Sequence, residues 1–386
     1  MSGPGPQVLV VTPGSWHFAE TARAFQRQGA LAQLWMSDRN KARFAPEKFR
    51  WCWPLFAATK PLHFVPGVRH AAEWAFWRAL PVWRAWLAAQ RYPECDVIHA
   101  RMGYALEPFA WAERAGRRVL KVVDCTNSHP TTQVGYWQRE LDLFAPGRRP
   151  VMPRSLFTRM NREIERADVV LCPSDFVRDT MLANGVPAEK CLVQPYGYDP
   201  GLFTPREAPP ERPRFLFTGT LCLRKGVHYL LRAFALAKRR LPGAELVLMG
   251  GLHPDFHGEY CRWAGTFEHI PHGSRDRVAR ELRRATAFVF PSCEEGFARS
   301  IMEALGTGLP VIASHESGAS TLLRDGRGGI VVGPRDVEGL AEAMVRLGED
   351  RALNARLGQE ARAAVAGHSW DDYGRDVIAQ YRARLG

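Results

Sequence analysis

Short apolar runs alternate with amphipathic segments along almost the whole chain, and this alternation restricts the fold more than any other feature. A strand followed by a helix, many times over, is the pattern of α/β domains with mainly parallel sheets. Strands are predicted at 7–11, 96–99, 118–123, 168–172, 191–194, 214–217, 245–249, 287–290, 311–313 and 330–332. Helices are predicted at 20–28, 108–115, 175–184, 226–239, 276–284 and 300–305.

A chain of 386 residues is too long for one ordinary core, so two domains are expected. The best linker candidate is Pro205–Pro213, which holds four prolines. Ser369-Trp370-Asp371-Asp372 has the pattern of a capping box that opens a last helix. The predicted units are therefore 1–200, 201–369 and a C-terminal helix at 370–386 that returns to the first domain.

Composition excludes several classes of protein. Hydrophobic residues make up 46% and charged residues 24%, which is typical of a folded globular chain. The eight cysteines form no CxxC pair, so neither a zinc site nor a disulfide framework is indicated, and scattered thiols fit a reducing cytoplasm. No run of about 20 apolar residues is present, and residues 8–11 are predicted as a strand rather than a signal peptide.

The net charge of +12 favours an anionic partner, and the excess lies in the first half. The segment Arg39–Arg91 carries ten Arg or Lys, two Glu and six of the twelve Trp. Trp74, Trp77, Leu80, Trp83 and Leu87 follow helical spacing, although Pro81 should break or kink a helix there. These side chains form either a buried stripe on the first domain or a surface that dips into an anionic membrane.

The strongest constellation of polar residues follows the predicted strand at 287–290. A glycine-containing loop there opens a short helix, and such loops bind phosphates in α/β sheets. Glu295 lies in the loop and Glu303 on the helix. Two carboxylates so placed can hold two hydroxyl-bearing parts of one ligand.

A second basic loop joins the strand at 214–217 to the helix at 226–239. Lys225 is expected in the first turn of that helix, where a cation opposes the helix dipole. A phosphate bound between Lys225 and the helix would remove the conflict, whereas a solvated loop lysine is the plain alternative.

These two loops carry a resemblance to the retaining nucleotide-sugar glycosyltransferases of family 4, which have the two-domain GT-B fold. The family signature E-G-F-x5-E followed by A-x-x-x-G-x-P-V-I-A is matched by Glu295-Gly296-Phe297, Glu303-Ala304 and Gly308 through Ala313. The family pattern G-R-L-x3-K-G appears as Gly219-Thr220-Leu221 followed by Lys225-Gly226. The resemblance is strong from about Asp168 onward and weaker before it.

The resemblance implies roles for these residues. Glu295 would contact the donor sugar, Glu303 the ribose and Lys225 the diphosphate. The turn at Gly14 would approach the donor phosphates from the other domain. His129 would be the histidine near the sugar, with His17 and His99 as rivals. The loop residues Phe297, Ala298 and Arg299 and the neighbours of Lys225, Thr220 and Arg224, would complete the donor site.

Two departures from the family bear on the diphosphate. Thr220 stands where the family usually has Arg, and Ala298-Arg299 stands where it usually has Gly-Leu. A leaving diphosphate needs two or more cationic or amide partners. We therefore expect Arg299, Arg224 or both to supply the missing charge, and otherwise the donor site is degraded.

The expected reaction is transfer of a hexosyl group (class EC 2.4) with retention, from a UDP- or GDP-linked sugar to a hydroxyl of a glycan or lipid-linked acceptor. The chain contains no D-x-D motif, so metal-independent transfer without a further cofactor is expected. The acceptor is expected to attack on the face that the leaving group departs. A cytoplasmic location follows, with possible contact to an anionic membrane face.

Other classes remain open at this stage. GT-B domains also occur in phosphorylases and epimerases, and a phosphorylase of this fold would carry a pyridoxal-phosphate lysine. A basic protein that binds anionic lipid or nucleic acid on a lapsed scaffold is the non-enzyme alternative. No helix-turn-helix, zinc-finger or RNP-type motif supports nucleic acid as a partner.

Overall fold

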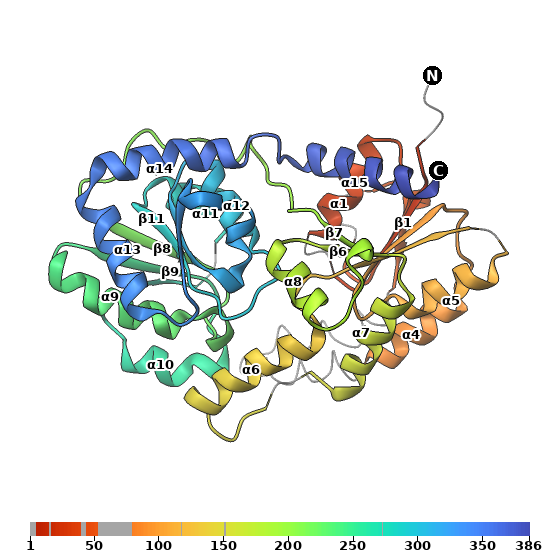
Figure 1. Ribbon diagram of the computed structural model, residues 1–386, viewed down its shortest axis with the longest axis horizontal. Coiled ribbons are helices and arrows are strands. Elements are labelled where there is room, and N and C mark those ends of the chain that lie inside the picture. The colour runs from red at the N-terminus through yellow and green to blue at the C-terminus, as the bar shows by residue number, and fades with distance from the viewer. Residues whose placement is uncertain are drawn as a thin grey trace.

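Two parallel β-sheets, each in its own half of the chain, form the framework of the computed structural model, which describes residues 5–14, 17–39, 44–52, 79–116, 118–149, 152–271 and 273–386. Figure 1 shows the two sheets as separate lobes along the long axis of the molecule. Each sheet is covered by helices, as expected for buried strands that are apolar on both faces. The GT-B fold predicted from the sequence is confirmed.

The first sheet has seven strands in the order β3-β2-β1-β4-β5-β6-β7, all paired in parallel. Its strands are β1 (Val8–Thr12), β2 (Leu31–Met36), β3 (Phe49–Trp51), β4 (Val97–Arg101), β5 (Leu120–Asp124), β6 (Val169–Cys172) and β7 (Cys191–Val193). Its helices are α1 (Phe18–Arg27), α4 (Leu80–Ala89), α5 (Leu106–Arg114), α6 (Pro130–Phe144), α7 (Arg154–Arg166) and α8 (Asp175–Ala183).

The second sheet has six parallel strands in the order β10-β9-β8-β11-β12-β13. Its strands are β8 (Arg214–Thr218), β9 (Glu245–Met249), β10 (Glu268–Ile270), β11 (Ala287–Phe290), β12 (Val311–Ser314) and β13 (Gly329–Val332). Its helices are α9 (Val227–Arg240), α10 (His257–Arg262), α11 (Arg275–Arg283), α12 (Arg299–Gly306), α13 (Val337–Glu349) and α14 (Arg351–Ala364).

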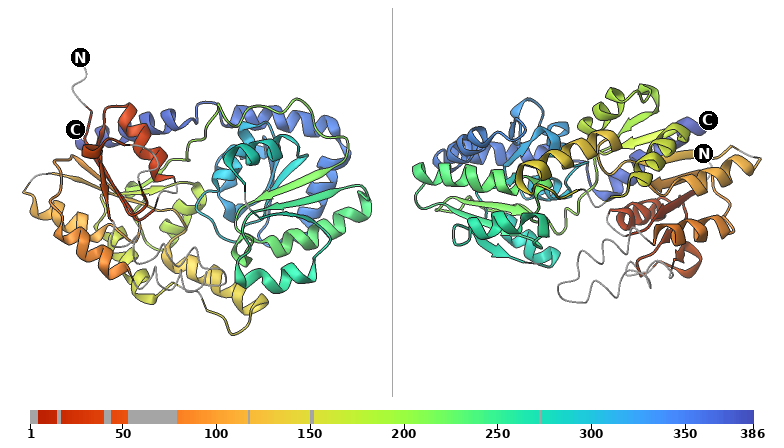
Figure 2. Two further views of the ribbon diagram at one scale, coloured as in Figure 1. Left: turned by 180° about the vertical axis from the view of Figure 1, so that it is seen from behind. Right: turned by 90° about the horizontal axis from the view of Figure 1, so that it is seen from below.

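The last helix, α15 (Trp370–Leu385), leaves the second lobe and packs against α1 of the first. Figure 2 shows the same crossing from behind and from below. Ser369 and Asp372 form the predicted capping box at its start. Gly197 lies under the crossing chain: a Cβ there would come within 2.6 Å of the Trp370 backbone, so a larger residue would push α15 away.

The tryptophan-rich segment is described only in part. Trp83, Leu80 and Leu87 are buried in the core of the first lobe, with Trp83 stacked on Trp86. Pro81 does not break a helix, because it lies in the first turn of α4, where its missing N–H has no intrahelical partner to lose. In this part of the segment the buried-stripe interpretation holds. Trp53, Trp74 and Trp77 lie outside the described residues.

No helix among the described residues is both long and apolar enough to cross a bilayer.

Candidate functional site

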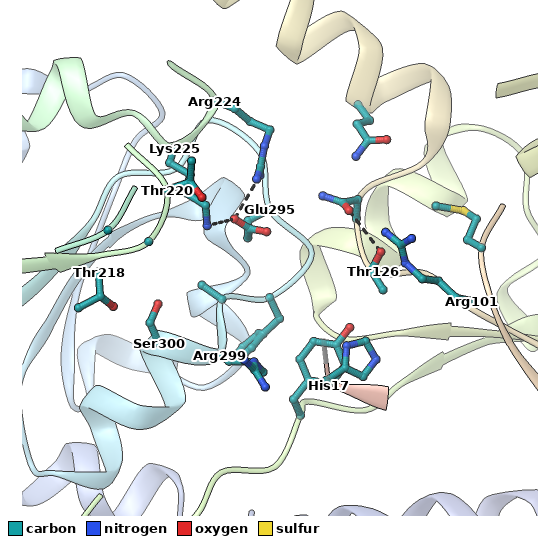
Figure 3. Close-up of a pocket in the computed structure, with 18 of the residues that line it drawn as sticks. His17, Arg101, Thr126, Thr218, Thr220, Arg224, Lys225, Glu295, Arg299 and Ser300 are labelled. Carbon is teal, nitrogen blue, oxygen red and sulfur yellow. Dashed lines mark hydrogen bonds and ion pairs between the residues drawn. The ribbon is translucent and has the colours of Figure 1, made fainter. Parts of the chain in front are cut away.

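A cavity of about 700 Å³ lies between the two lobes, at the carboxyl ends of β1, β4 and β5 on one side and of β8, β9 and β11 on the other. Ligands of open α/β sheets bind at this edge. The cavity is within the size range of small-molecule sites. Figure 3 shows its charged residues facing one another across the gap between the lobes.

The loop that contains Glu295 reaches across to the first lobe. A Cβ on Gly296 would meet the carbonyl oxygen of Thr126 at 2.0 Å, so only glycine allows this approach. The hydroxyl of Ser174 donates to the Gly296 carbonyl at 2.6 Å. The glycine of the signature therefore serves the contact between the lobes.

Glu295 is held between two cations of the second lobe. Its Oε2 accepts from Lys225 Nζ at 2.7 Å and from Arg224 Nη1 at 3.1 Å. Burial alone would raise the pKa of Glu295, but Arg224 and Lys225 outweigh it and lower the pKa to about 2. Glu295 therefore carries its negative charge throughout the neutral pH range.

Lys225 lies slightly earlier than predicted. It ends a 3-10 turn, Leu223–Lys225, and α9 begins at Val227 after Gly226. The carboxylate of Glu295 offsets its charge near the helix start, so the structure resolves the conflict with the helix dipole by an ion pair.

Arg224 is committed to the interface between the lobes. Besides Glu295, its guanidinium contacts the backbone oxygen of Glu294 at 2.6 Å and lies over the ring of Trp137. Burial alone would lower the pKa of Arg224, but the carboxylate of Glu295 and, more weakly, that of Glu294 raise it.

Arg299 and Glu303 differ from this paired group. Both line the cavity from α12, and in the described part of the chain no carboxylate lies within ion-pair distance of Arg299. Burial raises the pKa of Glu303, an effect that nearby Arg299 partly offsets. The Arg299 side chain is exposed, and Thr220, which stands where the family usually has Arg, also lines the cavity.

The first turn of α12 adds backbone donors. The helix begins at Arg299, its N-cap Ala298 provides no side-chain cap, and Ser300 lines the cavity beside it. The first N–H groups of a helix lack intrahelical acceptors and favour anions. Phe297 and Ala298, both buried, form the adjoining wall.

Glu294, which the sequence did not single out, fastens the two lobes together. It is fully buried, and it accepts from Ser128 N at 3.1 Å, from Ser128 Oγ at 3.0 Å and from Trp137 Nε1 at 3.0 Å. Its place next to Glu295 in the motif was the one signal available, because the partners come from β5–α6 of the other lobe.

His129 does not line the cavity. Its ring is buried at the start of α6, where Nδ1 accepts from the Thr131 backbone at 3.3 Å, and burial lowers its pKa. His17, one of the two rivals, does line the cavity (Figure 3). Gly14 is likewise outside the lining residues and turns back on Thr12, whose hydroxyl donates to its carbonyl at 2.8 Å.

His17 belongs to a buried network that sequence reasoning missed. Its Nε2 lies 3.0 Å from Asp124 Oδ2, and the same oxygen lies 3.0 Å from Nε2 of His99. Asp124 ends β5 and His99 lies in β4, which separates β1 from β5 in the sheet. The sequence offered one signal of this network, because a buried strand ends in Asp124. The carboxyl ends of neighbouring parallel strands lie close together, so residues from the adjacent strands can be expected to contact this carboxylate.

The first-lobe wall of the cavity joins an apolar part to the polar side chains of Arg101, Thr126, Asn127 and Gln133. Met102, Met152, Leu156 and Met160 line it, next to Tyr104. Methionine side chains are flexible and fit apolar groups of irregular shape. This wall faces the charged wall built by the second lobe.

In the part of the chain that is described, no three His, Cys, Asp or Glu side chains gather as a metal site would require.

Comparison with known proteins agrees with this geometry. Residues 14–202 match the model "Glycosyltransferase Family 4", and residues 212–350 match "Glycosyl transferases group 1". A D-inositol 3-phosphate glycosyltransferase of Nocardia farcinica is 30% identical over 54% of this chain and 53% of its own. A glycogen synthase of Mycobacterium tuberculosis is 32% identical over 47% of this chain and 43% of its own. The chain thus spans about half the length of the curated relatives it matches.

Two solved structures share the fold over nearly their whole length. Sucrose-phosphate synthase from Thermosynechococcus elongatus has a TM-score of 0.74 at 20% identity and covers 98% of this chain and 99% of its own. Anabaena HepE in complex with UDP and glucose has a TM-score of 0.70 at 15% identity, with 98% and 100% covered. With the two family models on consecutive halves, the chain belongs to the family 4 (group 1) glycosyltransferases of the GT-B fold.

Proposed function

We propose that this protein is a retaining glycosyltransferase that moves a hexosyl group from a UDP- or GDP-linked sugar to a hydroxyl of a glycan or lipid-linked acceptor. The observation that carries the proposal is the arrangement of charges on α12. Arg299, which has no ion-pair partner among the described residues, lies at the start of this helix, and Glu303 follows one turn later on the same helix. Cation and backbone donors suit a diphosphate, and a carboxylate one turn further suits ribose hydroxyls. That HepE was solved with UDP supports the choice of donor.

Each group has a defined task in the reaction. Lys225, Arg299 and the N–H groups of α12 stabilise the diphosphate as the bond from the anomeric carbon to its phosphate oxygen breaks. The acceptor hydroxyl forms the new bond to that carbon on the same face. Its proton passes to the departing phosphate oxygen, so no enzyme nucleophile takes part.

Glu295 has a second task in this scheme. Its Oε2 pairs with Lys225 Nζ at 2.7 Å, and a bound diphosphate would compete for the same cation. Glu295 would then be released toward hydroxyls of the donor sugar. We propose that this exchange couples donor binding to the assembly of the sugar subsite.

The cations support transfer without a metal ion or a further cofactor. Three positive side chains, Arg224, Lys225 and Arg299, line the second-lobe side of the cavity, where they could neutralise a diphosphate. The methionine and leucine side chains of the first-lobe wall support an acceptor that carries an apolar part, as a lipid-linked acceptor does. Neither feature supports nucleic acid as a partner.

Calorimetric titration with UDP, GDP, UDP-glucose and GDP-mannose, each with and without EDTA, tests the donor assignment. One nucleotide class should bind, with equal affinity in EDTA, and Glu303→Ala should abolish the binding. Glu342→Ala, on the exposed face of α13, is the matched control. Binding of no nucleotide by the intact chain would overturn the proposal.

Product analysis tests the stereochemistry. With the donor identified, NMR of the first-formed product should show the anomeric configuration of the donor. An inverted product would refute same-face attack and would require a base on the acceptor.

Contact with an anionic membrane face at the cytoplasmic side is a separate proposal, supported by the basic composition of residues 39–91. Flotation with anionic and neutral liposomes should show binding to the anionic ones alone. The variant with Trp74 and Trp77 changed to Ser should float less. Equal flotation of the wild type and the variant, or no flotation of either protein, would refute the proposed membrane contact.

A further inference from the structure

We propose that a buried chain of hydrogen bonds, His17–Asp124–His99–Tyr381, fixes the His17 ring in the tautomer with a bare Nδ1, so that His17 meets the substrate as a hydrogen-bond acceptor for a hydroxyl. This inference rests on the proposed function, since it concerns the same cavity. It also makes α15 a part of the site, because Tyr381 lies on that helix.

The geometry of the chain is continuous. Asp124 Oδ2 lies 3.0 Å from Nε2 of His17 and 3.0 Å from Nε2 of His99. His99 Nδ1 lies 2.8 Å from the Tyr381 hydroxyl. All four residues are at most 4% exposed, so water does not compete for these bonds.

The positions of the protons follow from the charge of Asp124. Burial alone would raise its pKa, but His17 and His99 outweigh burial and hold the pKa well below its usual range. An ionised carboxylate only accepts hydrogen bonds, so both Nε2 atoms must carry protons. A neutral imidazole has one proton, which leaves its Nδ1 bare.

His17 is the neutral member that faces the cavity. Burial lowers its pKa, Asp124 opposes that effect, and Arg299 and His99 add to it. A further buried cation here would lack a partner, because the one carboxylate is already shared. In the described part of the chain, Nδ1 of His17 makes no hydrogen bond.

The ring is also held mechanically. It stacks on Phe18 at 4.1 Å and against Tyr196 at 4.2 Å between ring centres. It therefore cannot turn to present its other nitrogen without unpacking both neighbours. Asp124 in turn depends on the two histidines, because its buried Oδ1 has no partner among the described residues.

An acceptor at this position selects its ligand group. A hydroxyl can donate to a bare Nδ1, whereas a phosphate oxygen has no proton to offer and prefers Arg299 and Lys225. The cavity is therefore polarised, with a sugar or acceptor hydroxyl at His17 and the diphosphate at the second lobe. Asp124, His99 and Tyr381 are positioning residues in this scheme.

Nitrogen NMR of imidazole-labelled full-length protein tests the tautomer directly. The chain has 12 histidines, so the His17 signals are assigned by their loss in His17→Gln. We expect His17 with protonated Nε2 and bare Nδ1 at neutral pH. A protonated Nδ1, or protons on both nitrogens, would overturn the proposal. This readout requires no activity, so it is independent of whether the transferase proposal holds.

Two variants test the positioning role. Asp124→Asn should mix the His17 tautomers and lower kcat about 10- to 100-fold, with nucleotide affinity nearly unchanged. Tyr381→Phe removes one hydroxyl and leaves the carboxylate in place, so it should fold even where Asp124→Asn does not. It should lower kcat about fivefold, as for one neutral hydrogen bond.

The matched control is Tyr373→Phe. It removes a buried hydroxyl from the same helix, but Tyr373 is not a member of the hydrogen-bonded series His17–Asp124–His99–Tyr381. It should change kcat less than twofold. Equal losses in Tyr381→Phe and Tyr373→Phe would mean that both act through packing of α15, and the positioning role would be refuted.

Discussion

The two walls of the cavity differ in how they hold polar groups. The second-lobe wall presents formal charges on loops and helix starts. Lys225 and Glu295 form an ion pair, whereas Arg299 and Glu303 have no ion-pair partner among the described residues. The first-lobe wall presents methionine and leucine around His17, whose pKa burial lowers, together with the cation Arg101 at the end of β4. The second-lobe wall is therefore suited to an anionic leaving group, and the apolar part of the first-lobe wall to a hydroxyl that carries apolar bulk.

The walls also differ in how local their construction is. Lys225, Glu295, Arg299 and Glu303 come from two strand–loop–helix segments whose ligand groups lie within a few residues of each other. His17, in contrast, depends on β4, β5 and α15 together.

The largest effect should come from Lys225→Met. Loss of the cation that faces the diphosphate should lower kcat about 100- to 1000-fold, as removal of a transition-state donor does. Steady-state kinetics with the identified donor measures it. Arg239→Met, an exposed basic residue on α9, is the control. A loss below threefold would show that the charged wall does not serve the leaving group.

Glu303→Gln should weaken nucleotide binding about 10- to 100-fold, since it replaces charge-assisted hydrogen bonds by neutral ones. Calorimetric titration with the nucleoside diphosphate measures the change. The same titration with Glu342→Gln should match the wild type. Unchanged affinity in Glu303→Gln would place the ribose elsewhere.

Nucleotide affinity should also depend on pH through Glu303. Because its pKa is raised, the side chain takes up a proton at higher pH than an ordinary glutamate as the solution is acidified. Affinity should therefore fall as the pH drops toward 5. The ratio of wild-type to Glu303→Gln affinity isolates this group from titration of the nucleotide. A ratio that stays constant between pH 7.5 and 5 would contradict the assignment.

Arg299→Ala should lower the affinity for the nucleoside diphosphate about 5- to 10-fold and leave the affinity for the free nucleoside unchanged. The reason is that the side chain is exposed and pairs with phosphate alone. Competition binding with both ligands measures the two changes in affinity. An equal loss for both would assign Arg299 to the fold of the loop.

The smallest effect should come from Trp137→Phe at the contact between the walls. The variant loses one hydrogen bond to buried Glu294, which keeps its bonds from Ser128. The free energy of unfolding should therefore fall by about 1 kcal/mol. Thermal unfolding should show Tm lower by about 2–4 °C. An unchanged Tm would mean that Glu294 is held by the first lobe without Trp137.

The sequence predicted the charged wall well because its signals are local. The signature around Glu295 and Glu303 spans a strand end, a loop and the helix α12, and the basic loop before α9 is equally compact. Most predicted strands begin and end within two residues of the observed ones, since buried parallel strands are short, continuous apolar runs.

Helices α6 and α7 were not predicted, although they build much of the first-lobe wall. Helix α7 reads as strongly polar, with Arg159 and Glu163 buried as an ion pair rather than exposed. Helix α6 has glycine and β-branched residues near its start. Helix α6 lacks the plain apolar stripe that periodicity detects, whereas α7 carries one in Leu156, Met160 and Ile164, so that signal was present in the sequence and was overlooked.

The sequence by itself determined the α/β class, the two-lobed arrangement and the identity of the charged wall, because these depend on backbone preference and on spacing within single segments. The tertiary structure alone decided that His17 rather than His129 faces the cavity, that Glu294 ties the lobes together and that Tyr381 reaches His99. Those contacts join residues up to 282 positions apart, and only packing of the sheets and of α15 brings such residues together.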